Sequence, residues 1–192
     1  MVELISLSPD ELDVPVSQAA LEHQSISLLD PMPIVEYVAD CHGIGPNNFE
    51  HLVFVQSSTK HIRAAARPLE LPSSPDVDRA GIEFLRIDMA TPRLTTAAAM
   101  TWADAATKNV IDLERPQCLR YLRRTNLDLD AGHILMCTGR GFVLIRHLGC
   151  GLGVGFLEST RRDDDNFAQL RSLYPTAFSA EVDDISPFGN PC

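Results

Sequence analysis

One stretch decides the fold: Gly139-Arg-Gly-Phe-Val-Leu-Ile-Arg-His-Leu-Gly-Cys-Gly-Leu-Gly-Val-Gly-Phe156. An apolar run leads to a turn, and glycine then takes every second place. In a strand, alternate residues share a face. One face would carry the glycines Gly149, Gly151, Gly153 and Gly155, and the other Cys150, Leu152, Val154 and Phe156. A bare face lets another backbone or a ligand approach closely, which suits a nucleotide-binding loop or a tightly packed barrel strand.

A phosphate-binding loop must leave a strand and open a helix, whose N-terminal N–H groups hold the phosphate. Here the glycines run on into Phe156-Leu-Glu-Ser-Thr-Arg-Arg-Asp, which has the character of a turn. The chain also lacks a Gly-Lys-Ser/Thr loop. The barrel strand is therefore the favoured interpretation, and a small nucleotide-dependent enzyme is the weaker alternative.

The composition narrows the class of protein. With 192 residues, of which 45% are hydrophobic, the chain can bury the core of one domain or two small ones. It shows neither an apolar run long enough to cross a bilayer nor a basic-then-apolar leader. We expect an intracellular protein without a membrane partner, in the cytoplasm, the nucleolus or an organelle. The five cysteines lack a C-x-x-C pair and the six histidines lack metal-ligand spacing, so neither a metal nor a cofactor is expected.

The formal net charge is −10 and is concentrated at the ends. Residues 1–30 hold six acidic residues and no lysine or arginine, and residues 163–192 hold six acidic residues and one arginine. The body between them is close to neutral. Both ends are interpreted as acidic extensions, either loosely attached or used to bind a partner.

In the first half of the chain, hydrophobic periodicity and turn residues predict alternating helices and strands. Asp30-Pro-Met-Pro opens a helix that runs to about Cys41. The other predicted elements are a strand at 51–55, a helix at 57–66, a loop at 68–75, a strand at 81–87 and a helix at 95–106.

In the second half, a strand at 107–113 is predicted to precede an amphipathic helix at 114–124. Leu119 and Leu122 are expected to face inward from this helix. The remaining predicted elements are strands at 133–137 and 142–147, the glycine strand, and a short helix at 167–173.

Arginines supply the strongest functional signal. They gather at the end of the 114–124 helix, beside the strands and after the glycine strand. Such side chains are either solvated surface charge or a phosphate-binding face. A cysteine nucleophile paired with His147 is disfavoured, because Cys137 and Cys150 fall in apolar strands, so no catalytic residue is predicted.

Four segments together resemble a PUA domain, a small RNA-binding pseudo-barrel. They are Thr107 to Leu127, Gly141-Phe-Val-Leu-Ile-Arg, Leu152-Gly-Val-Gly155 and Leu173-Tyr-Pro-Thr176. The pattern is most similar to the PUA-like C-terminal regions of Fmu/Sun RNA cytosine-5 methyltransferases. Residues 81–99 resemble the pre-PUA region that precedes such domains, also found in small ribosome-assembly factors.

This chain departs from the family pattern at several places. Leu122-Arg-Arg-Thr125 replaces Leu-Arg-Gly-Glu, and Phe156 and Thr176 stand where basic residues are usual. The sequence has no room for a methyltransferase domain. By resemblance it is a binding module and not an enzyme.

The resemblance implies an α+β fold: an acidic extension (1–30), an α/β pre-PUA-like domain (31–106), a PUA-like pseudo-barrel (107–180) and an acidic tail (181–192). It implies binding of RNA, chiefly ribosomal RNA, together with ribosome-assembly or RNA-modification proteins. The alternative is a protein–protein adaptor in a ribonucleoprotein complex, with a degenerate RNA face. The residues expected to contact RNA are Lys108, Arg120, Arg123, Arg124, Arg146, Arg161 and Arg162.

Overall fold

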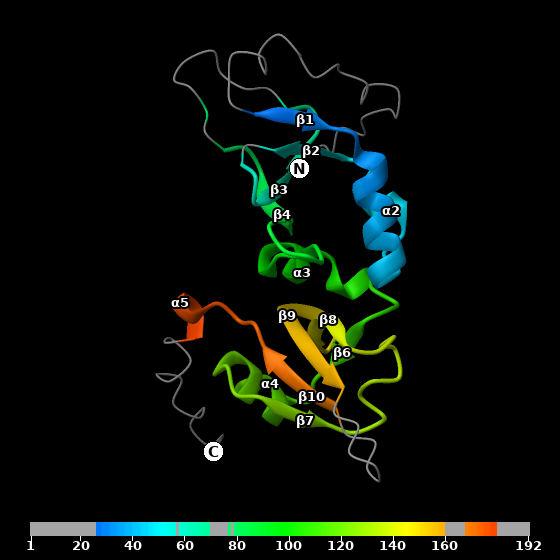
Figure 1. The fold of residues 1–192 in the computed structure, drawn as a ribbon, viewed down its shortest axis with the longest axis vertical. Helices are drawn as coiled ribbons and strands as arrows, with labels where there is room; N and C mark the ends of the chain where they lie inside the picture. Colours follow the sequence, from blue (N-terminus) through cyan, green and yellow to red (C-terminus); the bar gives the residue numbers. More distant parts are fainter. Residues whose placement is uncertain (1–25, 57, 70–76, 78, 160–167, 180–192) are drawn as a thin grey trace, which may run out of the picture.

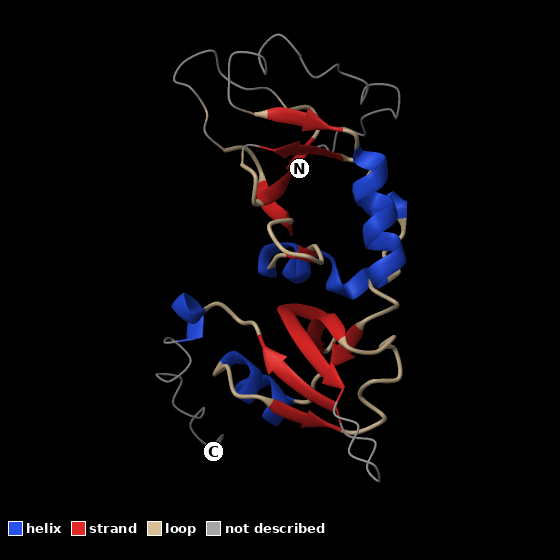
Figure 2. Cartoon of the chain, viewed as in Figure 1, coloured by secondary structure: helices blue, strands red, loops and turns tan. Residues whose placement is uncertain are grey.

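A computed structural model describes residues 26–56, 58–69, 77, 79–159 and 168–179 of the chain. These residues form an α+β fold with two five-stranded sheets (Figures 1 and 2). The expected fold class is confirmed at this level. The first 25 residues, most of the predicted loop at 68–75, and the acidic tail lie outside the described residues.

The first sheet is an antiparallel meander in the order β1-β2-β3-β4-β5. Its strands are β1 (Ser27–Leu29), β2 (Leu52–Gln56), β3 (His61–Ala66), β4 (Ile82–Arg86) and β5 (Arg93–Leu94). Because each of β2 to β5 pairs with the strand before it, this unit lacks the parallel crossovers implied by the α/β description. β1 lies within the range that the sequence assigned to the acidic extension, so the folded part begins earlier than predicted.

Two helical segments complete the first unit. The helix α2 (Pro31–His42) is N-capped by Asp30, whose carboxylate accepts a hydrogen bond from the Met32 N–H at 3.0 Å, and it ends at Gly43, which has φ 64°. This confirms the helix predicted from Asp30 onward. The short 3-10 helix η2 (Pro46–Phe49) follows and brings Phe49 into the core.

The aromatic centre of the first core joins η2, β2, β4 and α3 (Thr96–Trp102). The Phe49 ring lies 5.6 Å from that of Phe84 and 5.7 Å from that of Trp102, and Phe54 lies 5.0 Å from Phe84. Such tilted and edge-to-face pairs add to the stabilisation from apolar burial. The predicted helix at 95–106 is observed as α3 followed by the 3-10 helix η3 (Ala103–Ala105).

The second sheet has the order β6-β8-β9-β10-β7, with β6 parallel to β8 and the other pairs antiparallel. Its strands are β6 (Val110–Asp112), β7 (Leu127–Leu129), β8 (Gly141–His147), β9 (Cys150–Ser159) and β10 (Ala168–Ser172). The glycine stretch therefore forms a hairpin of two strands, which confirms its predicted strand character. A four-residue helix, α5 (Thr176–Ser179), follows β10.

The helix α4 (Arg115–Leu122) covers one face of this sheet and begins with a capping box between Glu114 and Gln117. Its fully buried side chain is Tyr121, whose hydroxyl donates a hydrogen bond to the Val154 carbonyl at 3.0 Å. The helix is where the sequence predicted it, and Leu122 packs against the second core as expected. Leu119 is exposed, because the buried side is set by Cys118 and Tyr121.

Three predicted elements are wrong. Residues 61–66 of the predicted 57–66 helix form strand β3, because they pair with both β2 and β4. Residues 133–137 form turns instead of a strand. Residues 168–172 form β10 instead of a helix, because they lie between β9 and β7 in the sheet.

The helix α3 lies between the two sheets (Figure 1). A Cβ atom placed on Gly151 of β9 would lie 2.9 Å from Met100 Cα and 3.0 Å from the Ala99 carbonyl carbon. The absence of a side chain at Gly151 therefore lets the backbone of α3 pack directly on the second sheet. Val110, Leu144 and Val154 of the second sheet belong to the same buried cluster as the first unit's aromatic residues.

The glycines of β9 do not share one face, contrary to the prediction. The register shifts between Ile145 and Arg146, and this irregularity breaks the alternation. Gly151 consequently faces α3, whereas a Cβ on Gly155 would meet the side chains of Leu170 and Ile145 in the other core. No helix in the described part of the chain is both long and apolar enough to cross a membrane.

Candidate functional site

Three of the arginines expected to contact RNA lie together at the end of α4. Arg120 donates to the Asn126 carbonyl at 2.9 Å. Arg123 is the C-cap residue, with an exposed side chain. Arg124 has φ 61° and donates to the Tyr174 carbonyl at 2.6 Å and to Thr176 Oγ1 at 2.8 Å. This cluster is exposed, but Arg124 also anchors the segment after β10.

The other expected residues are separated from that cluster. Arg146 pairs in a bidentate manner with Asp112, at 2.7 Å and 2.8 Å, and donates to the carbonyls of Ala103 and Ala106 at 3.3 Å each. Its guanidinium therefore holds η3 against β6 and β8. Lys108 is exposed at the junction of the two units, where its N–H donates to the His42 carbonyl at 3.0 Å. Arg161 and Arg162 lie outside the described residues.

A different set of side chains forms the best-defined candidate surface, which we call the arginine–phenylalanine row. Phe142 of β8 and Phe156 of β9 are cross-strand partners, and their rings meet edge to face at 5.2 Å. Arg171 of β10 is the partner of Phe156 on its other side. The row consists of Arg93, Arg140, Phe142, Phe156 and Arg171.

Each arginine of the row lies against an aromatic ring. The guanidinium carbons of Arg140 and Arg171 are 5.5 Å and 5.3 Å from the centre of the Phe156 ring, and that of Arg93 is 5.6 Å from Phe142. Cation–π contacts of this kind hold the guanidinium planes beside the rings. Phe156 therefore has a positive charge on each side and remains only partly buried.

The charges of the row are weakly neutralised. Within the part of the chain that the structure describes, Arg171 has one ion pair, with Glu158 at 3.7 Å, in which both side chains are partly exposed. Among the described residues, Arg140 has no ion-pair partner, and the buried Nε of Arg93 has no hydrogen-bond acceptor. Burial, reinforced by the nearby charge of Arg86, lowers the pKa of Arg93. The row thus offers guanidinium groups with unused donors next to half-exposed rings.

A pocket of about 150 Å³ adjoins the row where the two units meet. Four segments form its wall: one side of α2, the loop before β5, the chain just before β6, and the chain entering β8. It is lined by Tyr37, Cys41, His42, Thr91, Pro92, Asn109, Thr138, Gly139, Arg140, Gly141 and Phe142. Arg140 and Phe142 belong to both the pocket and the row, so the two features form a continuous surface.

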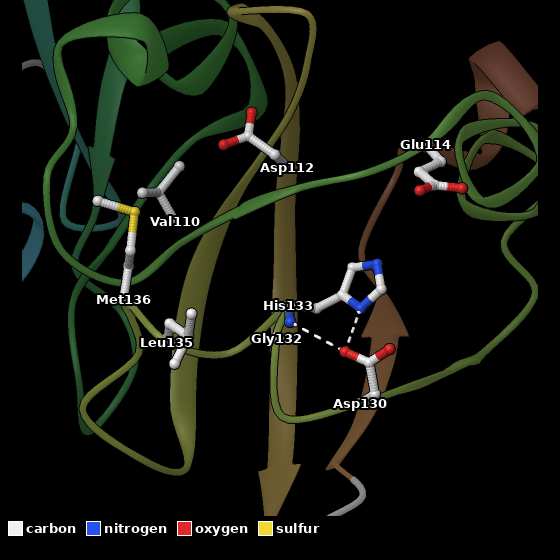
Figure 3. A pocket seen from close by; sticks show the side chains of 8 residues that line it. All are labelled: Val110, Asp112, Glu114, Asp130, Gly132, His133, Leu135 and Met136. Carbon is white, nitrogen blue, oxygen red and sulfur yellow. Dashed lines mark hydrogen bonds and ion pairs between the residues drawn. The ribbon is translucent and has the colours of Figure 1, made fainter.

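A second hollow, of about 340 Å³, lies beside β6 and the turns at 130–136 (Figure 3). Its acidic residues are Asp112, Glu114 and Asp130. Figure 3 shows His133 turned towards Asp130, with Leu135 and Met136 across the hollow. Leu135 is 82% exposed.

His133 is fully occupied within this hollow. Its Nδ1 lies 2.7 Å from Asp130 Oδ1, and its Nε2 lies 3.0 Å from Gln117 Nε2. Because an amide nitrogen only donates, Nε2 accepts and Nδ1 carries the proton that is donated to Asp130. Hydrogen bonds from His133 lower the pKa of Asp130. The pair fixes the 130–133 turn and leaves no ring nitrogen for a metal ion.

The described residues give little support to a metal site, a cysteine nucleophile or a phosphate-binding loop. They contain no group of three or more His, Cys, Asp and Glu side chains arranged to hold a metal ion. Cys137 lies in a turn and not in a strand, and burial raises the pKa of its thiol to about 11. The Nδ1 of His147 is engaged with the Leu113 carbonyl at 2.7 Å. The glycine stretch runs along β9 and opens no helix, so it lacks the geometry of a phosphate loop.

The sequence did not identify the arginine–phenylalanine row. Its members come from five separate positions, and only the register of β8, β9 and β10 makes Phe142, Phe156 and Arg171 neighbours. The available signal in the sequence was the two phenylalanines, Phe142 and Phe156, placed symmetrically about the hairpin turn. Comparison with known proteins adds no assignment: no protein-family model matches the chain, and a search of curated proteins finds no match either.

Proposed function

We propose that this chain is a non-catalytic RNA-binding protein that binds ribosomal RNA during ribosome assembly or rRNA modification. The observation that carries the proposal is the Phe156 ring, flanked by the guanidinium groups of Arg140 and Arg171 and by Phe142. Aromatic rings on a sheet stack against unpaired bases, and adjacent arginines pair with phosphates. The resemblance of residues 107–176 to a PUA domain, preceded by a pre-PUA region, supports the same function.

The simpler interpretation is that the row only stabilises the sheet. Exposed cation–π contacts contribute about 0.5–1 kcal/mol each, so they do stabilise the folded chain. A purely structural set, however, would not require three guanidinium groups around two rings when the described residues supply one weak ion pair to them. Excess positive charge beside partly exposed rings is what single-stranded nucleic acid requires.

The row is proposed as the main contact and the α4 arginines as a second one. Arg120, Arg123 and Arg124 lie near the end of β10, because Arg124 contacts Tyr174 and Thr176. Arg146 is left out of the surface, since its hydrogen bonds hold Asp112 and three backbone carbonyls. Arg161 and Arg162 stay predictions from the sequence.

Fluorescence anisotropy with a labelled single-stranded rRNA segment tests the proposal. Binding should weaken by at least about ten-fold between about 50 mM and 200 mM salt, since phosphate contacts release counterions. Arg140→Glu should weaken binding strongly. Arg115→Glu, at the exposed start of α4, makes the same change in charge away from the row and should have little effect.

If Arg140→Glu and Arg115→Glu reduce RNA affinity equally, only the net charge of the protein matters. RNA affinity that does not change with salt would contradict a phosphate interface. Arg123→Glu combined with Arg124→Glu tests the second contact. Thermal unfolding of the double variant must be measured alongside, because Arg124 also holds the segment after β10.

The acidic hollow favours a second candidate function, a protein–protein adaptor in a ribonucleoprotein complex. Glu114 and Asp130 next to the exposed Leu135 suit a basic and apolar segment of a partner. Affinity purification with and without RNase separates the two functions. Partners that all remain after RNase treatment would favour the adaptor, whereas their loss would favour RNA binding.

A further inference from the structure

We propose that the pocket between α2 and the start of β8 holds one unpaired nucleobase of the RNA strand that lies on the arginine–phenylalanine row. This inference rests on the proposed RNA-binding function and adds the kind of RNA that is selected. The ligand would be a flat nitrogen heterocycle, still attached to its strand.

The wall of the pocket is built before any ligand binds. Tyr37 donates its hydroxyl proton to the Pro92 carbonyl at 2.5 Å. The Asn109 amide donates to the Cys41 carbonyl at 2.7 Å, and its oxygen accepts from the N–H and hydroxyl of Thr138 at 2.9 Å and 3.0 Å. These bonds tie α2, the loop before β5 and the chain entering β8 into one frame. A preformed frame of this kind lowers the entropic cost of binding a rigid ring.

One buried polar atom in the wall has no partner. His42 lines the pocket with only 4% of its surface exposed, and its Nδ1 lacks a hydrogen-bond partner among the described residues. Burial lowers the pKa of His42 to about 4, so the imidazole is neutral at physiological pH. A neutral imidazole nitrogen donates or accepts according to its tautomer, and both kinds of group occur on base edges. A buried polar group without a partner is unfavourable, so a base edge that came within reach of this nitrogen would be favoured.

The opposite side of the pocket is bare. A Cβ atom on either Gly139 or Gly141 would meet no other atom within 4 Å. The backbone between Thr138 and Phe142 is therefore open to close approach by a flat ring. Phe142 supplies an aromatic surface, and Arg140 supplies a guanidinium at the side that faces the row.

The size of the pocket limits the occupant to one base. A volume of about 150 Å³ is what a single aromatic ring of benzene size occupies in an engineered apolar cavity of another protein. A base pair does not fit. Because Arg140 and Phe142 continue into the row, a strand held by Arg171 and Phe156 has a direct path for one unstacked base into the pocket.

The test uses the full chain and an RNA hairpin with a single bulged 2-aminopurine, whose fluorescence reports stacking and burial. We expect binding to change the fluorescence, and the bulged hairpin to bind at least about ten-fold more tightly than a fully paired one, in line with the energy of stacking one base. The same hairpin with an abasic bulge should bind like the paired one. Equal affinity for the three RNAs would overturn the inference.

Gly141→Leu places a bulky side chain at the open side of the pocket and should reduce the preference for the bulged hairpin over the paired one. Gly141→Ala is the smaller matched change and should reduce the preference only partly. A preference that persists in Gly141→Leu would contradict the inference. The wild-type fluorescence gives a result even if a variant folds poorly.

The outcomes distinguish a failure of this inference from a failure of the proposed RNA-binding function. If the protein binds all three hairpins with equal affinity, the base pocket is contradicted and the RNA-binding function is supported. If the protein binds none of the hairpins, both the base pocket and the RNA-binding function are contradicted. If a free nucleoside monophosphate stabilises the protein as much as the bulged hairpin does, the pocket takes a small nucleotide and the assignment to an RNA strand is wrong.

Discussion

Arg146 and Asp112 form a bidentate ion pair between neighbouring parallel strands, with Nε–Oδ1 at 2.7 Å and Nη2–Oδ2 at 2.8 Å. The remaining guanidinium nitrogen reaches the carbonyls of η3. This arginine, which the sequence assigned to an RNA surface, connects the second sheet to the helical layer above it. A charged residue near the end of an apolar strand can therefore have a structural function that its sequence context does not reveal.

Arg146→Ala should destabilise the protein by about 2 kcal/mol, because it leaves the Asp112 carboxylate and the η3 carbonyls without their donor. For a chain of this length the melting temperature should fall by roughly 4–8 °C. Thermal unfolding followed by circular dichroism measures the effect. Arg140→Ala removes an exposed arginine that has no ion pair among the described residues and one cation–π contact, so the melting temperature should fall by only about 1–4 °C. Similar losses in both variants would contradict the structural role.

Gly151→Ala should destabilise the protein by about 1–3 kcal/mol, since the added methyl group would press into the backbone of α3 at Ala99 and Met100. Gly141→Ala is the matched control on the same hairpin. Its methyl group meets nothing within 4 Å, so stability should stay the same or rise slightly. Chemical denaturation of the two variants provides the comparison, and a Gly151→Ala protein as stable as the wild type would refute the close packing.

His42 should make stability depend on pH in a defined window. Its pKa is about 4 in the folded chain and 6.5 in the unfolded chain, so between these values the unfolded state binds more protons. The free energy of unfolding should therefore fall as the pH drops from about 6.5 towards 4, by up to roughly 3 kcal/mol. Urea titrations across this range measure the slope.

His42→Gln should flatten that slope, and His51→Gln, at an exposed site, should not. Asp88 and Asp130 act in a different window. Their lowered pKa values add stability that is lost only as the pH falls below about 4. A wild-type protein whose stability is constant between pH 6.5 and 4.5 would rule out the buried neutral imidazole.

Phe156 and Arg171 should affect RNA binding in different ways. Phe156→Leu removes the ring but keeps an apolar side chain, so affinity should fall by about 1–3 kcal/mol with the salt dependence unchanged. Arg171→Gln removes one charge and should reduce the slope of log affinity against log salt by about one. Anisotropy titrations at several salt concentrations measure both quantities. If both variants change the slope equally, Phe156 does not stack on a base.

Local signals predicted much of the fold. Asp30 followed by Pro31 marked the start of α2, and the apolar run at 141–147 marked β8. β3 was missed because Ala64, Ala65 and Ala66 have high helix propensity, which pairing with two neighbouring strands overrides. Propensity describes a segment alone, and this segment is stabilised by strands before and after it in the chain.

The candidate site was harder to predict than the fold. Arginines are visible in a sequence, but whether one is held by a carboxylate, as in Arg146, or rests on a ring, as in Arg171, depends on strand register. The pocket beside His42 depends even more on tertiary structure, because residues more than sixty positions apart meet there. Its polar wall has no counterpart in any local motif.

The end of α2 has a consequence for attempts to divide the protein into fragments. The carbonyls of Cys41, His42 and Gly43 accept hydrogen bonds from Asn109, Lys108 and Thr107, which are the first residues of the second unit. A cut near residue 106 would deprive this helix of its capping donors and expose apolar side chains on both sides of the cut. Neither fragment should fold by itself, and the two sheets should melt in a single cooperative transition.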